Sequence, residues 1–249
     1  MKKRFGFTLA EVLITLGIIG VVSMMVLPTI KGETEKIVTM AQLKHSYSTL
    51  QNAIRMSEYH NGKIKRWDMK LSGSEFFHKY IKSYLKYSNE YSKEQLKAMN
   101  ITRTLLNGQK YTGTTFSGSS SGSTYGKSYI FELLDGSTVA FNLNAPSDNG
   151  IWVGIDVNGF NPPNRIGRDT FLFFISPNYG MQPFGGLGTP NKYGWNYGKE
   201  YKREKIMNSS SACACNKNAP RDAGYWCTAL IINDGWKISK DYPWSKVKK

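Results

Sequence analysis

The strongest pattern in the chain is an unbroken apolar run that extends from Phe7 to Ile30. As an α-helix this run would measure roughly 36 Å, and the hydrocarbon core of a bilayer is about 30 Å thick. Lys2, Lys3 and Arg4 precede it, and basic flanks stay on the cytoplasmic side of a membrane. The pattern therefore predicts a single-pass membrane helix with a cytoplasmic N-terminus.

Beyond the membrane segment, apolar residues recur at intervals of three and four, which indicates one face of a continuing helix. This helix is predicted to end near Asn61-Gly62, and Pro28 is predicted to kink it because proline lacks a backbone N–H. The stripe consists of Ile37, Met40, Leu43, Tyr47, Leu50 and Ile54.

The remaining chain alternates helical and β-type patterns and predicts one folded head of the α+β class. Helical spacing is found at 75–85 and 93–99, while 112–126 and 177–201 resemble loops. Asp135-Gly136 predicts a hairpin turn, so the strands are expected to form an antiparallel meander. The expected strands are Lys127–Leu134, Ser137–Leu143, Ile151–Val157 and Thr170–Ser176.

One charged side chain, Glu11, interrupts the apolar run. A carboxylate inside a membrane helix costs about 2.5–3.5 kcal/mol, so it marks a functional position and needs a cation nearby. Cleavage after Gly6 would create one, the α-amino group of Phe7. A secretory signal peptide has a shorter apolar core followed by a small-residue cleavage site, and a plain membrane anchor leaves Glu11 unexplained.

The residues Gly6-Phe7-Thr8-Leu9-Ala10-Glu11 resemble the processing motif of type IV prepilins and type II secretion pseudopilins. The resemblance implies that a prepilin peptidase cuts after Gly6 and methylates Phe7. Glu11 then becomes the fifth residue of the mature chain, where this family has a glutamate, and Pro28 falls where many members have a proline. The implied fold is a long N-terminal helix packed on an antiparallel β-sheet head.

The resemblance also implies a domain organisation and a location. Residues 1–6 would be the leader, 7–30 the transmembrane helix, 31–60 its amphipathic continuation and 61–249 the head. The expected partners are prepilin peptidase, identical or related pilin subunits and an inner-membrane assembly platform. The protein would reside in the bacterial inner membrane and then in a periplasmic or extracellular filament.

Three cysteines lie close together near the C-terminus, at Cys213, Cys215 and Cys227. Such grouping suits one disulfide in an oxidising compartment, with Cys227 closing on Cys213 or on Cys215. The expected arrangement resembles the C-terminal disulfide of many pilins. A zinc site is disfavoured because no histidine lies near the cysteines.

A loop rich in Asp and Asn, between the last two predicted strands, suggests calcium as a cofactor. Asp156, Asn158 and Asp169 carry the oxygens that a hard cation prefers, and Gly159 allows a turn. Some pseudopilins hold calcium in a loop near the sheet. The loop is not an EF-hand, because Gly167 stands where the bidentate glutamate would be, and an Asx-rich turn explains the same residues.

The net charge of +15 suits a solvated basic surface, and it also suits contact with DNA or an anionic surface. A minor pilin that binds DNA or a surface is therefore one alternative to a plain filament subunit. A membrane-anchored domain that never polymerises is another.

The sequence contains no enzyme motif of the kinds that carry hydrolase, metalloprotease or dinucleotide-binding chemistry. Its three histidines, His45, His60 and His78, form no evident pair with a nucleophile. The expectation is a structural protein and not an enzyme.

Overall fold

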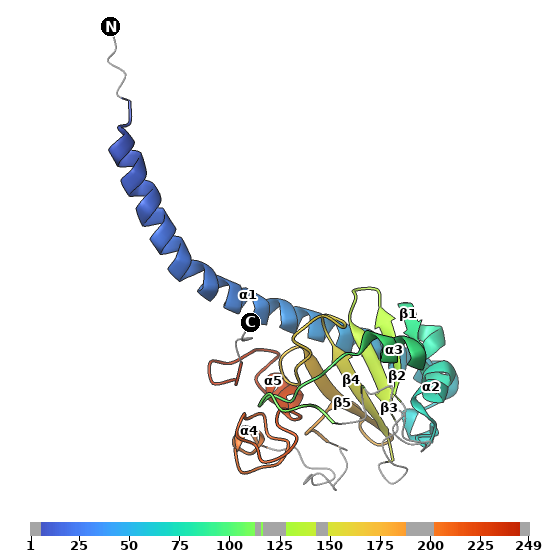
Figure 1. Cartoon of the computed structure of the whole chain (residues 1–249). Helices are drawn as coiled ribbons and strands as arrows, with labels where there is room; N and C mark the ends of the chain where they lie inside the picture. The colour runs from blue at the N-terminus through green and yellow to red at the C-terminus, as the bar shows by residue number, and fades with distance from the viewer. Residues whose placement is uncertain (1–5, 113–115, 117–127, 143–148, 188–201, 245–249) are drawn as a thin grey trace. The chain divides into compact units, whose positions relative to one another are not determined.

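The structure is a computed structural model that describes residues 6–112, 116, 128–142, 149–187 and 202–244 (Figure 1). The chain divides into two compact units, residues 1–38 and residues 39–249. Helix α1 (Leu9–Asn61) contributes to both. The predicted loop at 112–126 lies mostly outside the described residues.

Helix α1 is continuous in its backbone assignment through Pro28, and the predicted kink there stays a prediction. In the second unit its apolar stripe is buried as predicted, at Met40, Leu43, Leu50 and Ile54. Ile37 is the exception, because it lies in the first unit and is 70% exposed.

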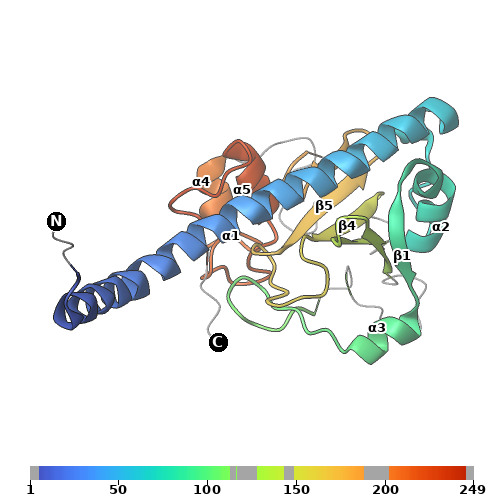
Figure 2. The same cartoon turned by 90° about the horizontal axis from the view of Figure 1, so that it is seen from above.

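The head is built on a six-stranded antiparallel sheet in which each strand pairs with the next along the chain. Part of this sheet is seen beside α1 in Figure 2. The predicted meander is confirmed, with a strand added at each edge. The Asp135-Gly136 turn joins the second and third strands. The strands are β1 (Tyr87–Tyr91), β2 (Tyr129–Leu133), β3 (Thr138–Asn142), β4 (Ile151–Asp156), β5 (Thr170–Ser176) and β6 (Gly180–Pro183).

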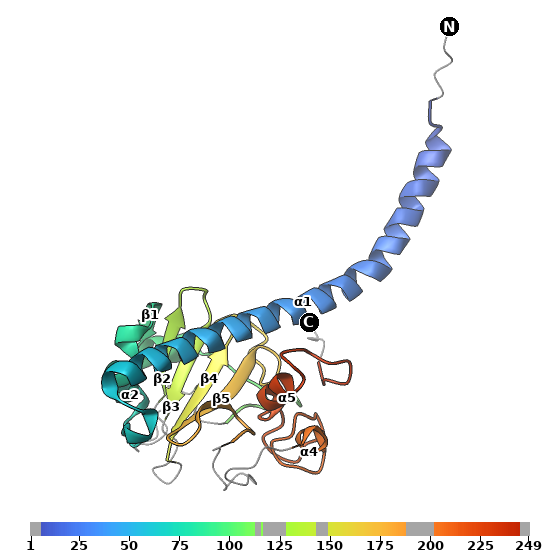
Figure 3. The same cartoon turned by 180° about the vertical axis from the view of Figure 1, so that it is seen from behind.

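One face of the sheet is covered by the part of α1 that belongs to the head (Figure 3). The ring of Tyr47 stacks on that of Phe173 with centroids 5.4 Å apart. The hydroxyls of Ser46 and Ser137 lie 3.0 Å apart, which ties the helix to the β2–β3 turn. Only one side of α1 faces the sheet, and therefore its buried residues recur at intervals of three and four.

The opposite face is covered by irregular chain and by a C-terminal helix, which explains why β4 and β5 are buried along their whole length. Phe184 packs on Trp152 with ring centroids 4.3 Å apart. The backbone N–H of Leu172 donates to the hydroxyl of Thr228 in α5 at 3.0 Å. Both faces of the sheet therefore contribute to one core.

Short helical elements fill the connections. The predicted helix at 75–85 is observed as three consecutive pieces, and the one at 93–99 matches α3. The other helices were not predicted. The elements are η1 (Ile64–Arg66), α2 (Gly73–Phe76), η2 (Phe77–Ile81), η3 (Lys82–Tyr84), α3 (Lys93–Met99), α4 (Arg203–Met207) and α5 (Cys227–Asn233).

Candidate functional site

The N-terminal turn of α1 holds the motif residues together through a reciprocal hydrogen-bond cap. The backbone N–H and the hydroxyl of Thr8 donate to a carboxylate oxygen of Glu11 at 2.8 and 2.7 Å. The backbone N–H of Glu11 in turn donates to the Thr8 hydroxyl at 3.3 Å. This is a capping box, which satisfies N–H groups that a helix start leaves unpaired.

The large apolar side chains that follow are exposed from Leu9 to Val26. Leu9–Val26 form a window of 18 residues with a mean hydropathy of 2.3, long and apolar enough to cross a membrane, and none of it is buried. Phe7 is 90% exposed. Because large apolar side chains at such density are unfavourable in water, this segment requires a bilayer or a protein partner.

Within the described residues no cation forms an ion pair with Glu11. The carboxylate of Glu11 therefore has hydrogen-bond partners in Thr8 but no positively charged partner among the described residues. The helix macrodipole favours an anion at this end, yet its partial charge is about half a unit.

Two family models match the chain. The model of a family of unknown function, DUF6613, matches residues 29–247. The chain belongs to that family. The model of the prokaryotic N-terminal methylation motif matches residues 1–27. No curated protein and no solved structure matches the chain.

This DUF6613 member thus carries the type IV pilin and pseudopilin signature at its N-terminus, on an α+β architecture that resembles a pilin. The signature makes it a pilin-like or pseudopilin subunit and implies membrane anchoring before assembly. It also implies a prepilin peptidase and other pilin subunits as partners. Proteins with this signature are structural and not enzymatic.

The predicted C-terminal disulfide is confirmed, and the partner of Cys227 is Cys215 and not Cys213. Cys215 and Cys227 form a disulfide, and Cys213 is free and buried. Burial raises the pKa of the Cys213 thiol, which keeps it protonated and unreactive. The disulfide joins the segment that follows α4 to the first residue of α5.

We expect the disulfide to stabilise the head by roughly 3 kcal/mol, because it closes a short loop in the unfolded chain. Cys215→Ala should therefore lower the midpoint of thermal unfolding by about 6–12 °C. Thermal unfolding of the detergent-solubilised protein, followed by tryptophan fluorescence, measures the shift. Cys213→Ala is the matched control, since it leaves the disulfide intact. A reductant should reproduce the shift in the wild type; if it does not, the disulfide contributes no stability.

The structure does not support the calcium prediction at Asp156, Asn158 and Asp169. Among the described residues, no group of three His, Cys, Asp or Glu side chains could hold a metal ion. The side chain of Asp156 is fully buried and pairs with the guanidinium of Arg103 at 2.9 Å. Burial raises the pKa of this carboxyl group, and the charge of Arg103 opposes the shift.

Asp169 has a structural role in the same loop. Its carboxylate accepts the backbone N–H groups of Asn164 at 2.8 Å and of Arg165 at 2.6 Å. Asn158 donates to the carbonyl of Pro162 at 3.2 Å. The Asx-rich turn is thus held by its own hydrogen bonds and by an arginine from a distant segment, which was the alternative interpretation of the sequence.

The three histidines lie at separate places on the head. His45 lies 3.7 Å from Asp135, and His78 lies 3.5 Å from Glu90. His60 stacks on Tyr84 with ring centroids 5.4 Å apart. None of these arrangements joins a histidine to the free thiol of Cys213.

Glu90 is the centre of a polar cluster that sequence analysis did not find. Burial alone would raise the pKa of Glu90, but hydrogen bonds from Lys82, Tyr129 and Tyr87 lower it to about 2. Lys82 donates at 2.8 Å and Tyr87 at 2.6 Å. The cluster ties the edge strand β1 to η3 and to β2.

Because the pKa of Glu90 is lower in the folded than in the unfolded state, its ionised form stabilises the fold. This contribution should be fully present above the ordinary pKa of 4.5 and should disappear as the pH falls to about 2. The difference in unfolding midpoint between wild type and Glu90→Gln, measured across this range, should shrink toward zero at the acidic end. A difference that stays constant with pH would contradict this role.

Proposed function

We propose that the protein is a structural subunit of a type IV pilus-like or type II secretion pseudopilus filament. Its N-terminus lies in the cytoplasm while the subunit resides in the inner membrane, and prepilin peptidase cleaves it after Gly6 and methylates Phe7. Residues 1–6 act as the leader, 7–30 as the membrane helix, 31–60 as its amphipathic continuation and 61–249 as the head.

The observation that carries this proposal is the uncompensated carboxylate of Glu11 in an otherwise apolar, exposed helix. Cleavage after Gly6 frees the α-amino group of Phe7, four residues before Glu11. A stack of such helices brings the amine of one subunit to the carboxylate of its neighbour. The pair neutralises both charges, and the apolar side chains pack against those of other subunits.

Pro28 and the glycines on either side of it give the assembly helix a weak region. Proline removes one helical hydrogen bond, and Gly20 and Gly32 lower the helix propensity further. We propose that this region adjusts when the helix leaves the bilayer for the filament, although the backbone of the single chain is helical there.

Co-expression with a prepilin peptidase and an assembly platform tests the proposal. We expect filaments that react with antibody to the head in electron micrographs, and none when the peptidase is omitted. A protein that stays in the membrane fraction as single subunits, with all assembly components present, would show an anchored domain that does not polymerise.

A further inference from the structure

The end of α1 forms an exposed aromatic and basic corner on the head. The ring of Tyr59 is 85% exposed and meets His60 edge-on, with centroids 5.1 Å apart. His60 stacks on Tyr84 at 5.4 Å with an interplanar angle of 16°. The Tyr59 corner is defined as Tyr59, His60 and Tyr84 together with the basic residues Lys63, Lys65 and Arg66.

Hydrogen bonds hold this corner in one conformation. The backbone N–H of Ile64 donates to Glu58 at 2.9 Å, and the indole N–H of Trp67 donates to the carbonyl of Gly62 at 2.8 Å. These bonds fold the basic segment back against the end of α1. The side-chain amide of Asn61 donates to the hydroxyl of Tyr84 at 3.3 Å, which fixes the third ring.

The charge of the corner is available for a ligand. Lys63, Lys65 and Arg66 are exposed, and within the described residues none of them forms an ion pair. Glu58 and Asp68 are the nearest acids in sequence, and each accepts a backbone N–H, from Ile64 and from Lys70. Three cations against two carboxylates leave a positive balance, which favours an anionic ligand.

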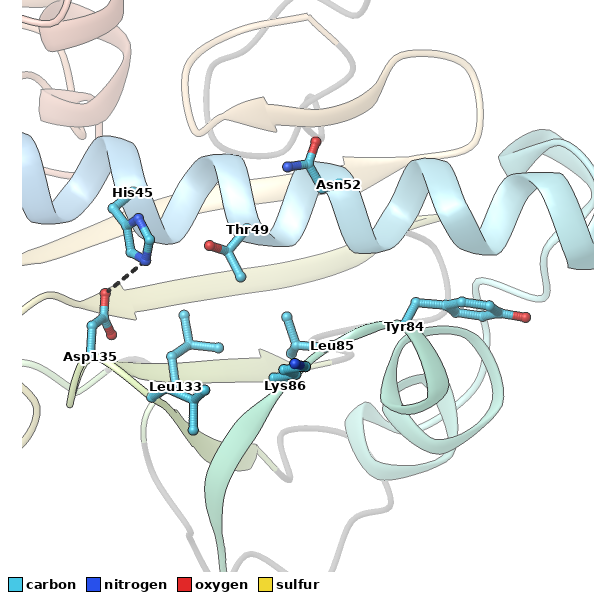
Figure 4. A pocket seen from close by; sticks show the side chains of 9 residues that line it. His45, Thr49, Asn52, Tyr84, Leu85, Lys86, Leu133 and Asp135 are labelled. Carbon is cyan, nitrogen blue, oxygen red and sulfur yellow. Dashed lines mark ion pairs between the residues drawn. The ribbon is translucent and has the colours of Figure 1, made fainter.

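A half-open cavity of about 290 Å³ adjoins the corner, because Tyr84 also lines it (Figure 4). Thr49 and Asn52 of α1 lie on one side of the cavity, and Lys86 lies on the other. Leu85, Leu133 and Leu134 also line the cavity, so its walls combine apolar surface for a base with polar side chains. Asp135 closes the far end beside His45.

We propose that the Tyr59 corner and the adjoining cavity bind single-stranded nucleic acid. Exposed aromatic rings stack on unpaired bases without sequence preference, and basic side chains along the path neutralise the phosphates. A duplex is excluded from this mode because its bases are already stacked on one another. The site goes beyond the filament role, and it functions whether or not the subunit polymerises.

The test measures binding of the full-length protein, in detergent micelles, to a fluorescent oligothymidylate. Tyr59→Ala should weaken binding by about 5-fold to 150-fold, the loss expected for one stacked base. Tyr59→Ala should leave the affinity for an abasic oligonucleotide of the same length unchanged, since that probe has the phosphates but no bases. Tyr179→Ala removes another exposed aromatic ring and is the matched control.

The basic residues are tested by the salt dependence of the same binding. Lys65→Gln combined with Arg66→Gln should reduce the slope of log affinity against log salt by about 1.4, the value for two phosphate contacts on a single strand. Lys237→Gln combined with Lys240→Gln makes the same charge change elsewhere and should leave the slope unchanged.

Four results would overturn the proposal. Wild-type affinity in Tyr59→Ala would exclude stacking, and an equal loss with the abasic probe would show that only charge is recognised. Equal effects of the two double variants would show that binding is spread over the basic surface. If Tyr59→Ala binds oligothymidylate normally but fails to form filaments, the corner is a subunit contact and not a nucleic-acid site.

Discussion

Glu11→Gln is expected to be cleaved and methylated normally and to fail in filament assembly. Glutamine can replace glutamate in a capping box. The variant can therefore still accept hydrogen bonds from Thr8, but it loses the negative charge. The amine of the neighbouring subunit then lies in an apolar environment without a counter-charge. Breaking a buried ion pair costs about 3–5 kcal/mol, which weakens subunit addition more than about a hundredfold.

Thr8→Val is the complementary variant, because it weakens the helix cap but keeps the charge. It removes the hydroxyl that donates to Glu11 and leaves the carboxylate of Glu11 in place. We expect this variant to assemble, and we expect Glu11→Ala to behave like Glu11→Gln. Sedimented filaments, compared with total processed subunit, measure each outcome. Assembly of Glu11→Gln together with failure of Thr8→Val would show that the glutamate serves the helix start and not a neighbouring amine.

Arg103→Met is expected to destabilise the head by about 3–5 kcal/mol, because it leaves the carboxylate of Asp156 buried and unpaired. The side chains of Arg103 and Asp156 are 5% and 0% exposed. The guanidinium also lies over the ring of Phe116 at 4.2 Å, so the variant loses a cation–π contact as well. Urea unfolding of the detergent-solubilised protein measures the loss.

The double variant Arg103→Met with Asp156→Asn tests the cause. No buried charge remains in it, so it should be more stable than Arg103→Met alone. The deficit of the single variant should also grow as the pH rises, because a buried carboxyl group with a raised pKa stabilises the fold in its protonated form. A double variant as unstable as the single one would show that packing, and not charge, holds this loop.

The elements that sequence analysis found are those whose own pattern matches their environment. Helix α1 has the helical period of the stripe it buries. The central strands β3, β4 and β5 are apolar, β-favouring runs that are buried at every position. The edge strand β1 was missed because Ser88, Asn89 and Glu90 are polar, and it is held by pairing with β2 and by the Glu90 cluster. Strand β6 was missed because it begins at Gly180 and ends at Pro183, which usually interrupt strands.

The C-terminal helices illustrate structure that comes from tertiary contacts. Helix α5 has the sequence CTALIIN, which is short, has no side-chain cap and contains β-branched residues. Its first residue, Cys227, is fixed by the disulfide, and its Thr228 hydroxyl accepts a hydrogen bond from β5. Neither constraint can be inferred from the local sequence.

The N-terminal motif was recognisable from the sequence because the basic flank, Gly6, Phe7 and Glu11 lie within a short contiguous segment. The roles of these residues in processing and assembly stay predictions. The capping partner Thr8 was missed, although the T-x-x-E spacing is a known signal for a helix start. The calcium hypothesis failed because Arg103, the partner of Asp156, is 53 residues away in sequence.

The central claim is that the chain becomes a filament subunit through cleavage after Gly6. Intact mass and N-terminal peptide analysis of the protein recovered from its filament fraction tests this claim most directly. We predict a chain that begins with N-methylated Phe7 and lacks residues 1–6. Recovery of the chain with Met1 or Lys2 still attached would contradict the claim.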